Sequence, residues 1–142
     1  DVRTIRFRVS DLIEKVRGEI YDLRSHAEFN SSLREIVRSI SPSITISIEE
    51  IELIEADRHL LLRVIPELLR NAHAHSGASQ IHLHLFSDDD GVMVKVTDNG
   101  RGGAIPTSGR YGLLGSIERV KDHGASIEID SRKEGTTITI RL

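Results

Sequence analysis

The chain has 142 residues, with 19 Lys and Arg against 22 Asp and Glu, no cysteine, and a formal net charge of −3. This length suits one domain with a core of its own, and the absence of cysteine excludes disulfides and thiolate metal sites. Because the sequence has neither a basic block nor a long apolar run, we expect no nucleic-acid partner and no membrane contact.

Residues 4–24 have the apolar spacing of an amphipathic helix. Two interpretations stay open: a helix of a dimerising bundle, or a helix packed on its own domain. Because the helical pattern starts almost at Asp1, we expect the sequence to be part of a longer protein. A second helix is predicted at 27–40, before Pro42. The seam of the first helix consists of Ile5, Val9, Leu12, Val16, Ile20 and Leu23.

The middle of the chain predicts a strand followed by a helix. Apolar and polar residues alternate over 44–55, which indicates one strand or two short ones. Residues 57–75 predict a helix with Asp57 as its N-cap and an apolar stripe along one side. Pro66 lies inside this helix and is expected to kink it or to remove one backbone hydrogen bond.

Two antiparallel hairpins are predicted in the second half of the chain. Residues 80–86 and 92–98 alternate in the manner of strands that bury one face. A helix at 113–123 should end at Gly124, and a final hairpin closes the chain. This order of elements predicts an α+β fold, in which helices cover one face of a sheet.

Polar side chains recur on one face of the helix predicted at 57–75. Glu67, Asn71 and His75 are spaced four residues apart, so they lie near one another and away from the apolar stripe. A carboxylate, an amide and an imidazole can form a polar wall against a ligand, and an Asn carbonyl oxygen suits Mg²⁺. A plain solvated helix face is the alternative.

The sequence DNGRGG follows a predicted strand and places Asp98 in a glycine-rich turn. Asp, Asn and Gly are ordinary turn residues, but Gly100 and Gly102 also allow the backbone to come close to a ligand. At the end of a strand, the carboxylate of Asp98 can accept a hydrogen bond from an exocyclic amine. The motif alone leaves both interpretations open.

Glycines also surround the start of the helix predicted at 113–123. Gly109, Gly112 and Gly115 leave bare amides at a helix N-terminus, which is a natural phosphate site. Residues 102–111 precede this helix and are expected to form a short mobile lid that bound phosphate groups order.

In this order, the features resemble those of the Bergerat-fold, or GHKL, ATP-binding domains, and in particular the catalytic ATP-binding domain of sensor histidine kinases. ELLRNAHAHS resembles the N box of that family, DNGRGG its G1 box, YGLLGSIERVKDHGASIEI its G2 box and next strand, and EGTTITIRL its closing strand. The likeness is strongest over residues 57–142. Its nearest form is the class of kinases that pairs with helix-turn-helix response regulators.

The resemblance implies a two-layer α/β sandwich, in which helices cover one face of a mixed, mostly antiparallel sheet that a bundle-type helix precedes. It divides the chain into residues 1–25, the end of a dimerisation region, and residues 26–142, the ATP-binding catalytic domain. ATP and Mg²⁺ are then the expected cofactors.

Roles carried over from the family are assigned by position. Glu67 would help to activate the accepting histidine, Asn71 would ligate Mg²⁺, and Asp98 would bind the adenine amine. The other nucleotide-binding residues that the resemblance implies are His75 in the N box, Gly100 and Gly102 at the adenine pocket, Gly112, Leu113 and Gly115 near the phosphates, and Thr136 or Thr137 beside the base.

The implied function is that of a two-component sensor histidine kinase, which donates the ATP γ-phosphoryl group to a histidine on an upstream dimerisation helix absent from this sequence. The whole kinase would be a homodimer with a response regulator as its partner. This part of it would be cytoplasmic, with or without a membrane anchor elsewhere. Alone, the chain is expected to bind ATP or ADP without labelling itself, because none of its seven histidines lies on such a helix.

Departures from the family pattern keep two alternatives open. Ala74 stands where Lys or Arg usually precedes the N-box histidine, Arg110 where the G2 box usually begins with glycine, and Pro66 where a polar helix former is common. The alternatives are an anti-sigma-factor-type serine kinase and a degenerate nucleotide-binding module that signals without catalysis.

Overall fold

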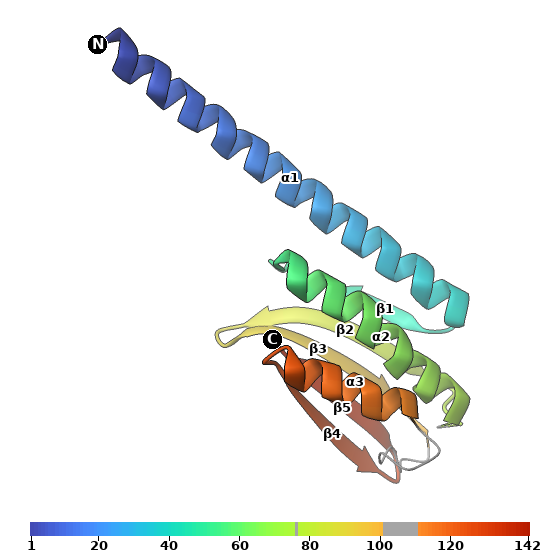
Figure 1. The fold of residues 1–142 in the computed structure, drawn as a ribbon. Helices are drawn as coiled ribbons and strands as arrows, with labels where there is room; N and C mark the ends of the chain where they lie inside the picture. Colours follow the sequence, from blue (N-terminus) through green and yellow to red (C-terminus); the bar gives the residue numbers. More distant parts are fainter. Residues whose placement is uncertain (76, 101–110) are drawn as a thin grey trace.

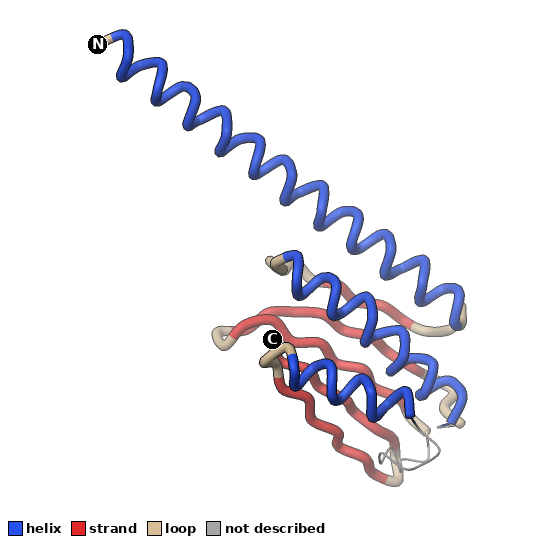
Figure 2. Tube along the Cα trace, viewed as in Figure 1, coloured by secondary structure: helices blue, strands red, loops and turns tan. Residues whose placement is uncertain are grey.

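The computed structural model describes residues 1–75, 77–100 and 111–142, which form a two-layer α+β domain with one long helix projecting from it (Figure 1). Helices cover one face of a five-stranded sheet, as Figure 2 shows. The predicted fold class is therefore confirmed. The elements in chain order are α1 (Val2–Ile40), β1 (Thr45–Ile48), α2 (Glu55–His75), β2 (Ile81–Asp88), β3 (Gly91–Asp98), α3 (Tyr111–Asp122), β4 (Ser126–Arg132) and β5 (Gly135–Arg141).

The sheet is mixed and has the strand order β1-β2-β3-β5-β4. β1 runs parallel to β2, whereas the other neighbouring pairs are antiparallel. Because successive side chains of a strand point to opposite faces, the registers bring apolar residues of neighbouring strands onto one face. Leu83, Val96 and Ile138 form one such row across β2, β3 and β5, and all three are buried.

The core lies between this face of the sheet and the helices. The apolar stripe of α2 includes Leu61, Ile65 and Leu68, whose side chains are fully buried, and α3 adds Leu113 and Val120. Burial of these side chains fixes which face each helix turns toward the sheet, so the polar faces of α2 and α3 are fixed as well.

α1 is one continuous helix of 39 residues, so the prediction of separate helices at 4–24 and 27–40 is wrong. The residues between the two predicted helices are Ser25 and His26. Because neither is a glycine or a proline, neither ends a helix, and the helix continues through both. The helix does end at its C-cap Ser41, before Pro42, as predicted.

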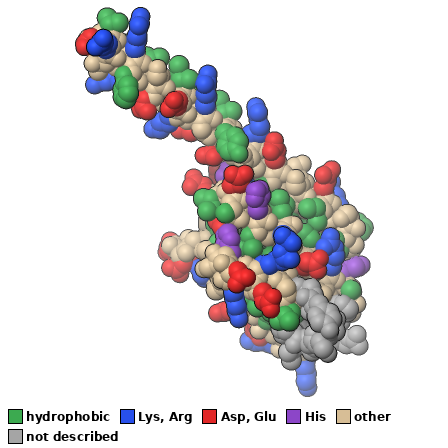
Figure 3. All heavy atoms as spheres, in the orientation of Figure 1, with side chains coloured by type: hydrophobic (Ala, Val, Ile, Leu, Met, Phe, Trp, Pro, Cys, Tyr) green, Lys and Arg blue, Asp and Glu red, His purple; other side chains and the backbone are tan. Residues whose placement is uncertain are grey.

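The two halves of α1 have different surroundings. Phe29, Leu33 and Val37 are buried in the core. The apolar residues of the N-terminal half are exposed, and Figure 3 shows apolar side chains along the protruding helix. Leu12 and Ile5, for example, are each 60% exposed. The predicted seam therefore does not pack on its own domain, and the bundle interpretation stays a prediction.

The middle of the chain differs from the prediction at its boundaries. Only Thr45–Ile48 of the segment 44–55 forms a strand. α2 begins at Glu55, so Asp57 is not its N-cap; instead the Oδ1 of Asp57 lies 2.7 Å from the Nε2 of His123 at the end of α3. Pro66 is buried and lies inside α2 without ending it.

The end of α3 follows the prediction. Gly124 has a φ of 86°, its N–H donates to the carbonyl of Lys121 at 3.0 Å, and the N–H of Ala125 donates to the carbonyl of Val120 at 3.1 Å. This pair of hydrogen bonds is the Schellman pattern with glycine at C′. Gly124 as the residue that ends the helix is therefore confirmed.

The division of α1 predicts opposite responses to one kind of substitution. Leu33→Ala should lower the free energy of unfolding by about 2–5 kcal/mol, because it leaves a cavity in the core. Leu12→Ala removes the same atoms from an exposed position and should change that free energy by less than about 0.5 kcal/mol in the dilute chain. Urea unfolding of both variants measures the difference, and equal losses would contradict the division.

Candidate functional site

Asp98 is the last residue of β3 and lies on the face of the sheet that the helices cover. It pairs with Ile81 of β2 on one side and with Thr136 of β5 on the other, and it is only 8% exposed. Its Oδ1 accepts a hydrogen bond from the N–H of Gly100 at 2.9 Å. Among the described residues no other hydrogen-bond donor to this carboxylate is found, so it can accept a further hydrogen bond.

Polar residues form a row across three strands at this end of the sheet. Asp98 of β3 lies opposite Thr136 of β5, which lies opposite Ser131 of β4, and the hydroxyl oxygens of Thr136 and Ser131 are 3.2 Å apart. The next row into the sheet is apolar, with Val96 and Ile138. The site is therefore the point where one face of the sheet changes from apolar to polar.

The two threonines of the final strand face opposite ways. Thr136 is 3% exposed and shares the face of Asp98. Thr137 lies between Thr97 and Asp130 on the other face, since side chains alternate along a strand. Of the pair that the sequence offered for the base, the structure brings only Thr136 beside Asp98.

Gly135 approaches the backbone of Asp98 more closely than any other residue type allows. A Cβ atom at Gly135 would lie 1.9 Å from the carbonyl oxygen of Asp98, and the φ of Gly135 is 146°. Both facts require glycine. Gly135 and Ser131 were not among the predicted site residues, because the strand pairing that places them was not visible in the sequence.

On α2, Glu67 and Asn71 occupy neighbouring turns but have different environments. The Oε1 of Glu67 accepts a hydrogen bond from the Nη1 of Arg70 at 2.9 Å, and both side chains are substantially exposed. The Nδ2 of Asn71 is buried and has no hydrogen-bond partner among the described residues. His75 is the last residue of α2, and its side chain lies outside the described part of the structure.

A buried amide without a partner is uncommon in native proteins. The oxygen and nitrogen of an Asn amide are interchangeable assignments, so either atom can occupy the unpaired position. With its oxygen there, Asn71 would offer the neutral oxygen ligand that Mg²⁺ accepts together with phosphates and water. The residue present therefore fits the predicted metal ligand.

The predicted phosphate region is described only in part. Gly100 is buried beside Asp98, whereas Gly102 and Gly109 and all of the predicted lid except Tyr111 lie outside the described residues. The first turns of α3 contain Gly112, then Leu113, which is 1% exposed, then Gly115. The end of α2, the end of β3 and the start of α3 lie at the same end of the domain (Figure 1).

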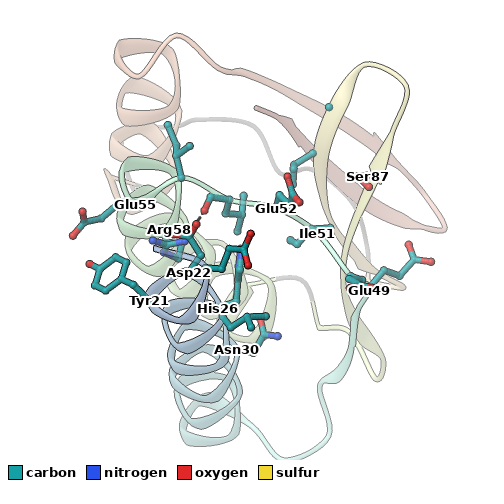
Figure 4. Close-up of a pocket in the computed structure, with 17 residues that line it drawn as sticks. Tyr21, Asp22, His26, Asn30, Glu49, Ile51, Glu52, Glu55, Arg58 and Ser87 are labelled. Carbon is teal, nitrogen blue, oxygen red and sulfur yellow. Dashed lines mark hydrogen bonds between the residues drawn. The ribbon is translucent and has the colours of Figure 1, made fainter. Parts of the chain in front are cut away.

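A pocket of about 1320 Å³ lies elsewhere, between α1, the segment 49–55 and the β2–β3 turn. Figure 4 shows the residues that line it, which include six acidic side chains and Arg58, whose Nη1 donates to the carbonyl of Leu53 at 2.5 Å. None of the predicted site residues is among them. The candidate site thus rests on the side chains that converge at the end of the sheet.

Comparison with known proteins identifies the family of the chain. Residues 56–142 match the family described as histidine kinase-, DNA gyrase B- and HSP90-like ATPases. The chain belongs to this family, and its matched part is an ATP-binding catalytic domain of the sensor histidine kinase type.

Particular relatives are sensor kinases. The chain is 28% identical to the signal transduction histidine-protein kinase/phosphatase DegS of Brevibacillus brevis, over all of this chain and 40% of that protein. It is 29% identical to the histidine-protein kinase/phosphatase UhpB of Salmonella typhimurium, over 99% of this chain and 30% of that protein. The chain thus spans less than half the length of these relatives.

Solved structures share the fold. The Acinetobacter baumannii histidine kinase AdeS has a TM-score of 0.67 at 16% identity, over 80% of this chain and 64% of that one. The mycobacterial sensor histidine kinase MprB has a TM-score of 0.61 at 24% identity, over 80% of this chain and 90% of that one. No helix in the described part of the chain is long and apolar enough to cross a membrane.

The contact between Gly135 and Asp98 leads to a prediction. Gly135→Ala should destabilise the fold and weaken nucleotide binding, because the new methyl group would push the start of β5 away from the carbonyl of Asp98. Gly18→Ala is the control, since nothing lies within 4 Å of a Cβ at that position. Thermal unfolding and ADP titration of both variants check this, and wild-type behaviour of Gly135→Ala would contradict the close approach.

Proposed function

We propose that this chain binds ATP with Mg²⁺ at the end of the sheet where Asp98 lies, as the catalytic domain of a two-component sensor histidine kinase. The observation that carries the proposal is the buried residue Asp98 at the end of β3, which accepts one hydrogen bond from the N–H of Gly100 and has Thr136 beside it. The family match supports ATP as the ligand.

Each residue of the site then has a stated task. Asp98 accepts a hydrogen bond from the exocyclic amine of adenine, in a water-poor place where that bond discriminates strongly, and Thr136 lies beside the base. The first amides of α3, near Gly112 and Gly115, face the phosphates at a helix N-terminus. Asn71 holds Mg²⁺, which neutralises phosphate charge when bound.

Glu67 is proposed to act on the accepting histidine, which we place on an upstream helix of the same kinase. General-base work requires that the proton lie within hydrogen-bond reach, so Glu67 has no acceptor to activate in this chain alone. In the present structure its carboxylate is held by Arg70. We propose Arg70 or His73 as the residue that replaces the phosphate contact that Ala74 does not provide.

The exposed seam of α1 supports the proposed dimer. A contiguous row of exposed apolar side chains indicates an interaction surface, and its spacing is that of a bundle helix. The relatives DegS and UhpB are named as histidine-protein kinases and phosphatases. We propose a response regulator as the partner of the whole kinase, with the helix-turn-helix class as the predicted type. Neither alternative function is favoured by a structural observation.

The assignment of Asp98 is tested by Asp98→Asn. Loss of a charged acceptor costs about 1.5–3 kcal/mol, so affinity for ADP should fall about tenfold to a hundredfold. Asp130→Asn makes the same chemical change on the opposite face of the sheet and should leave affinity unchanged. Titration calorimetry measures both, and an unchanged affinity of Asp98→Asn would remove this residue from the site.

Asn71→Ala separates a metal ligand from a structural residue. The variant should lose the Mg²⁺-dependent part of ADP affinity, yet the metal-free protein should be no less stable, because the substitution removes a buried amide without a partner. ADP titrations with Mg²⁺ and with EDTA, together with urea unfolding, give the two results. Arg63→Ala, at an exposed position two turns earlier on α2, is the control. A loss of stability without loss of the Mg²⁺ effect would make Asn71 structural.

A further inference from the structure

Asn99, directly after Asp98, forms a polar link between the end of β3 and the segment that leaves α2. Its Oδ1 accepts hydrogen bonds from the N–H of Ser79 at 3.0 Å and of Gln80 at 2.9 Å, and its Nδ2 donates to the hydroxyl of Ser79 at 2.9 Å. Its backbone N–H donates to the carbonyl of Gln80 at 3.2 Å. The side-chain amide is thus occupied within the protein.

These hydrogen bonds continue the sheet beyond its last strand pair. The β2–β3 ladder ends where Ile81 pairs with Asp98. One step further, the amide of Asn99 imitates a peptide group and takes the N–H groups of Ser79 and Gln80 that no strand partner reaches. Asn99 itself is exposed, so it adds nothing to the apolar core.

The segment that Asn99 holds begins just after the helix that carries Asn71. Asp98 is fixed independently by its pairing with β2 and β5. The C-terminal end of α2 is not part of the sheet, and four positions after His75 in the sequence stands Ser79, whose N–H donates to Asn99. Core packing places α2 against the sheet, and the hydrogen bonds of Asn99 add a direct link between the segment that follows α2 and the end of β3.

We infer that Asn99 is a positioning residue of the nucleotide site, which holds the end of α2, and with it Asn71, in register with Asp98. This inference rests on the function proposed above. In this role Asn99 contacts neither the base nor the metal. It keeps Asp98, which binds the base, and Asn71, which binds the metal, at a fixed separation, and a site needs such supporting hydrogen bonds to hold its geometry.

The test compares ADP binding by Asn99→Ala with and without Mg²⁺. Affinity for ADP with Mg²⁺ should fall about tenfold or more, in the range found when a residue that supports a metal ligand is removed. Affinity in EDTA should fall by a smaller factor, because Asp98 keeps its place in the sheet. Hydrogen exchange at the amides of Ser79 and Gln80 should accelerate, which confirms that the link has been broken.

Asn99→Asp is the rescue variant. A carboxylate keeps an oxygen at the position of Oδ1 as a stronger acceptor, and the hydroxyl of Ser79 can rotate to donate to the other oxygen. Most of the Mg²⁺-dependent affinity should therefore return. If Asn99→Ala weakens binding and Asn99→Asp does not restore it, the accepting oxygen is not the cause and the inference is wrong.

Asp88→Ala is the matched control. Like Asn99, Asp88 makes a side-chain hydrogen bond to the backbone: its Oδ1 accepts a hydrogen bond from the N–H of Asp90 at 2.9 Å. This bond lies in the β2–β3 turn, at the opposite end of the same two strands. Its loss should leave ADP affinity unchanged. If Asn99→Ala behaves like Asp88→Ala, Asn99 is only a turn residue. If the wild-type chain binds no ADP at all, the proposed function itself falls, which is a separate outcome.

Discussion

The burial of the Asp98 carboxylate is the constraint on which the rest of the site depends. β3 has hydrogen-bonded strands on both sides, so it cannot rotate to bring Asp98 into solvent. Since Val94 and Val96 point into the core, the alternation of the strand turns Asp98 inward as well. A buried charge is costly unless donors meet it, and among the described residues only the N–H of Gly100 does so. The fold thus holds the Asp98 carboxylate, a hydrogen-bond acceptor, at the edge of the core.

Three residues next to Asp98 hold the backbone and side chains around it. Gly135 allows β5 to begin against the carbonyl of Asp98, which in turn brings the hydroxyl of Thr136 onto the same face. Asn99 then binds the chain that arrives from α2. The backbone on both sides of Asp98 is therefore held by short contacts, and the site is built on strands and a helix end, which hold geometry better than loops do.

Much of this was predictable from local sequence. Alternation identified the hairpins, and the N-box and G1-box patterns placed Asn71 and Asp98 at the ends of a helix and a strand. What could not be predicted depends on pairing between distant segments. The register of β3 with β5 decides that Thr136 and not Thr137 shares the face of Asp98, and no local pattern contains that register. The continuity of α1 was missed for a different reason: the apolar seam ends at Leu23, and the end of the seam indicates the end of a helix, although the helix continues to Ile40.

Two features of the chain lack an interaction partner: a buried polar atom of Asn71 and a row of apolar side chains on α1. Asn71 carries one buried polar atom without a partner among the described residues, a deficit that a single ion or a phosphate oxygen can fill. α1 leaves a long row of exposed apolar side chains, a deficit of area that only another helix can fill. The first deficit lies inside the ATPase domain and the second outside it. These two features agree with the two proposed partners. A magnesium–nucleotide complex would meet the unpaired atom of Asn71, and the helices of a dimeric bundle would cover the exposed apolar row of α1. Because α1 is continuous from the seam to Leu33, the same helix joins both, so a rotation or tilt imposed on the seam by its partners would reach the core through Leu33 and Val37.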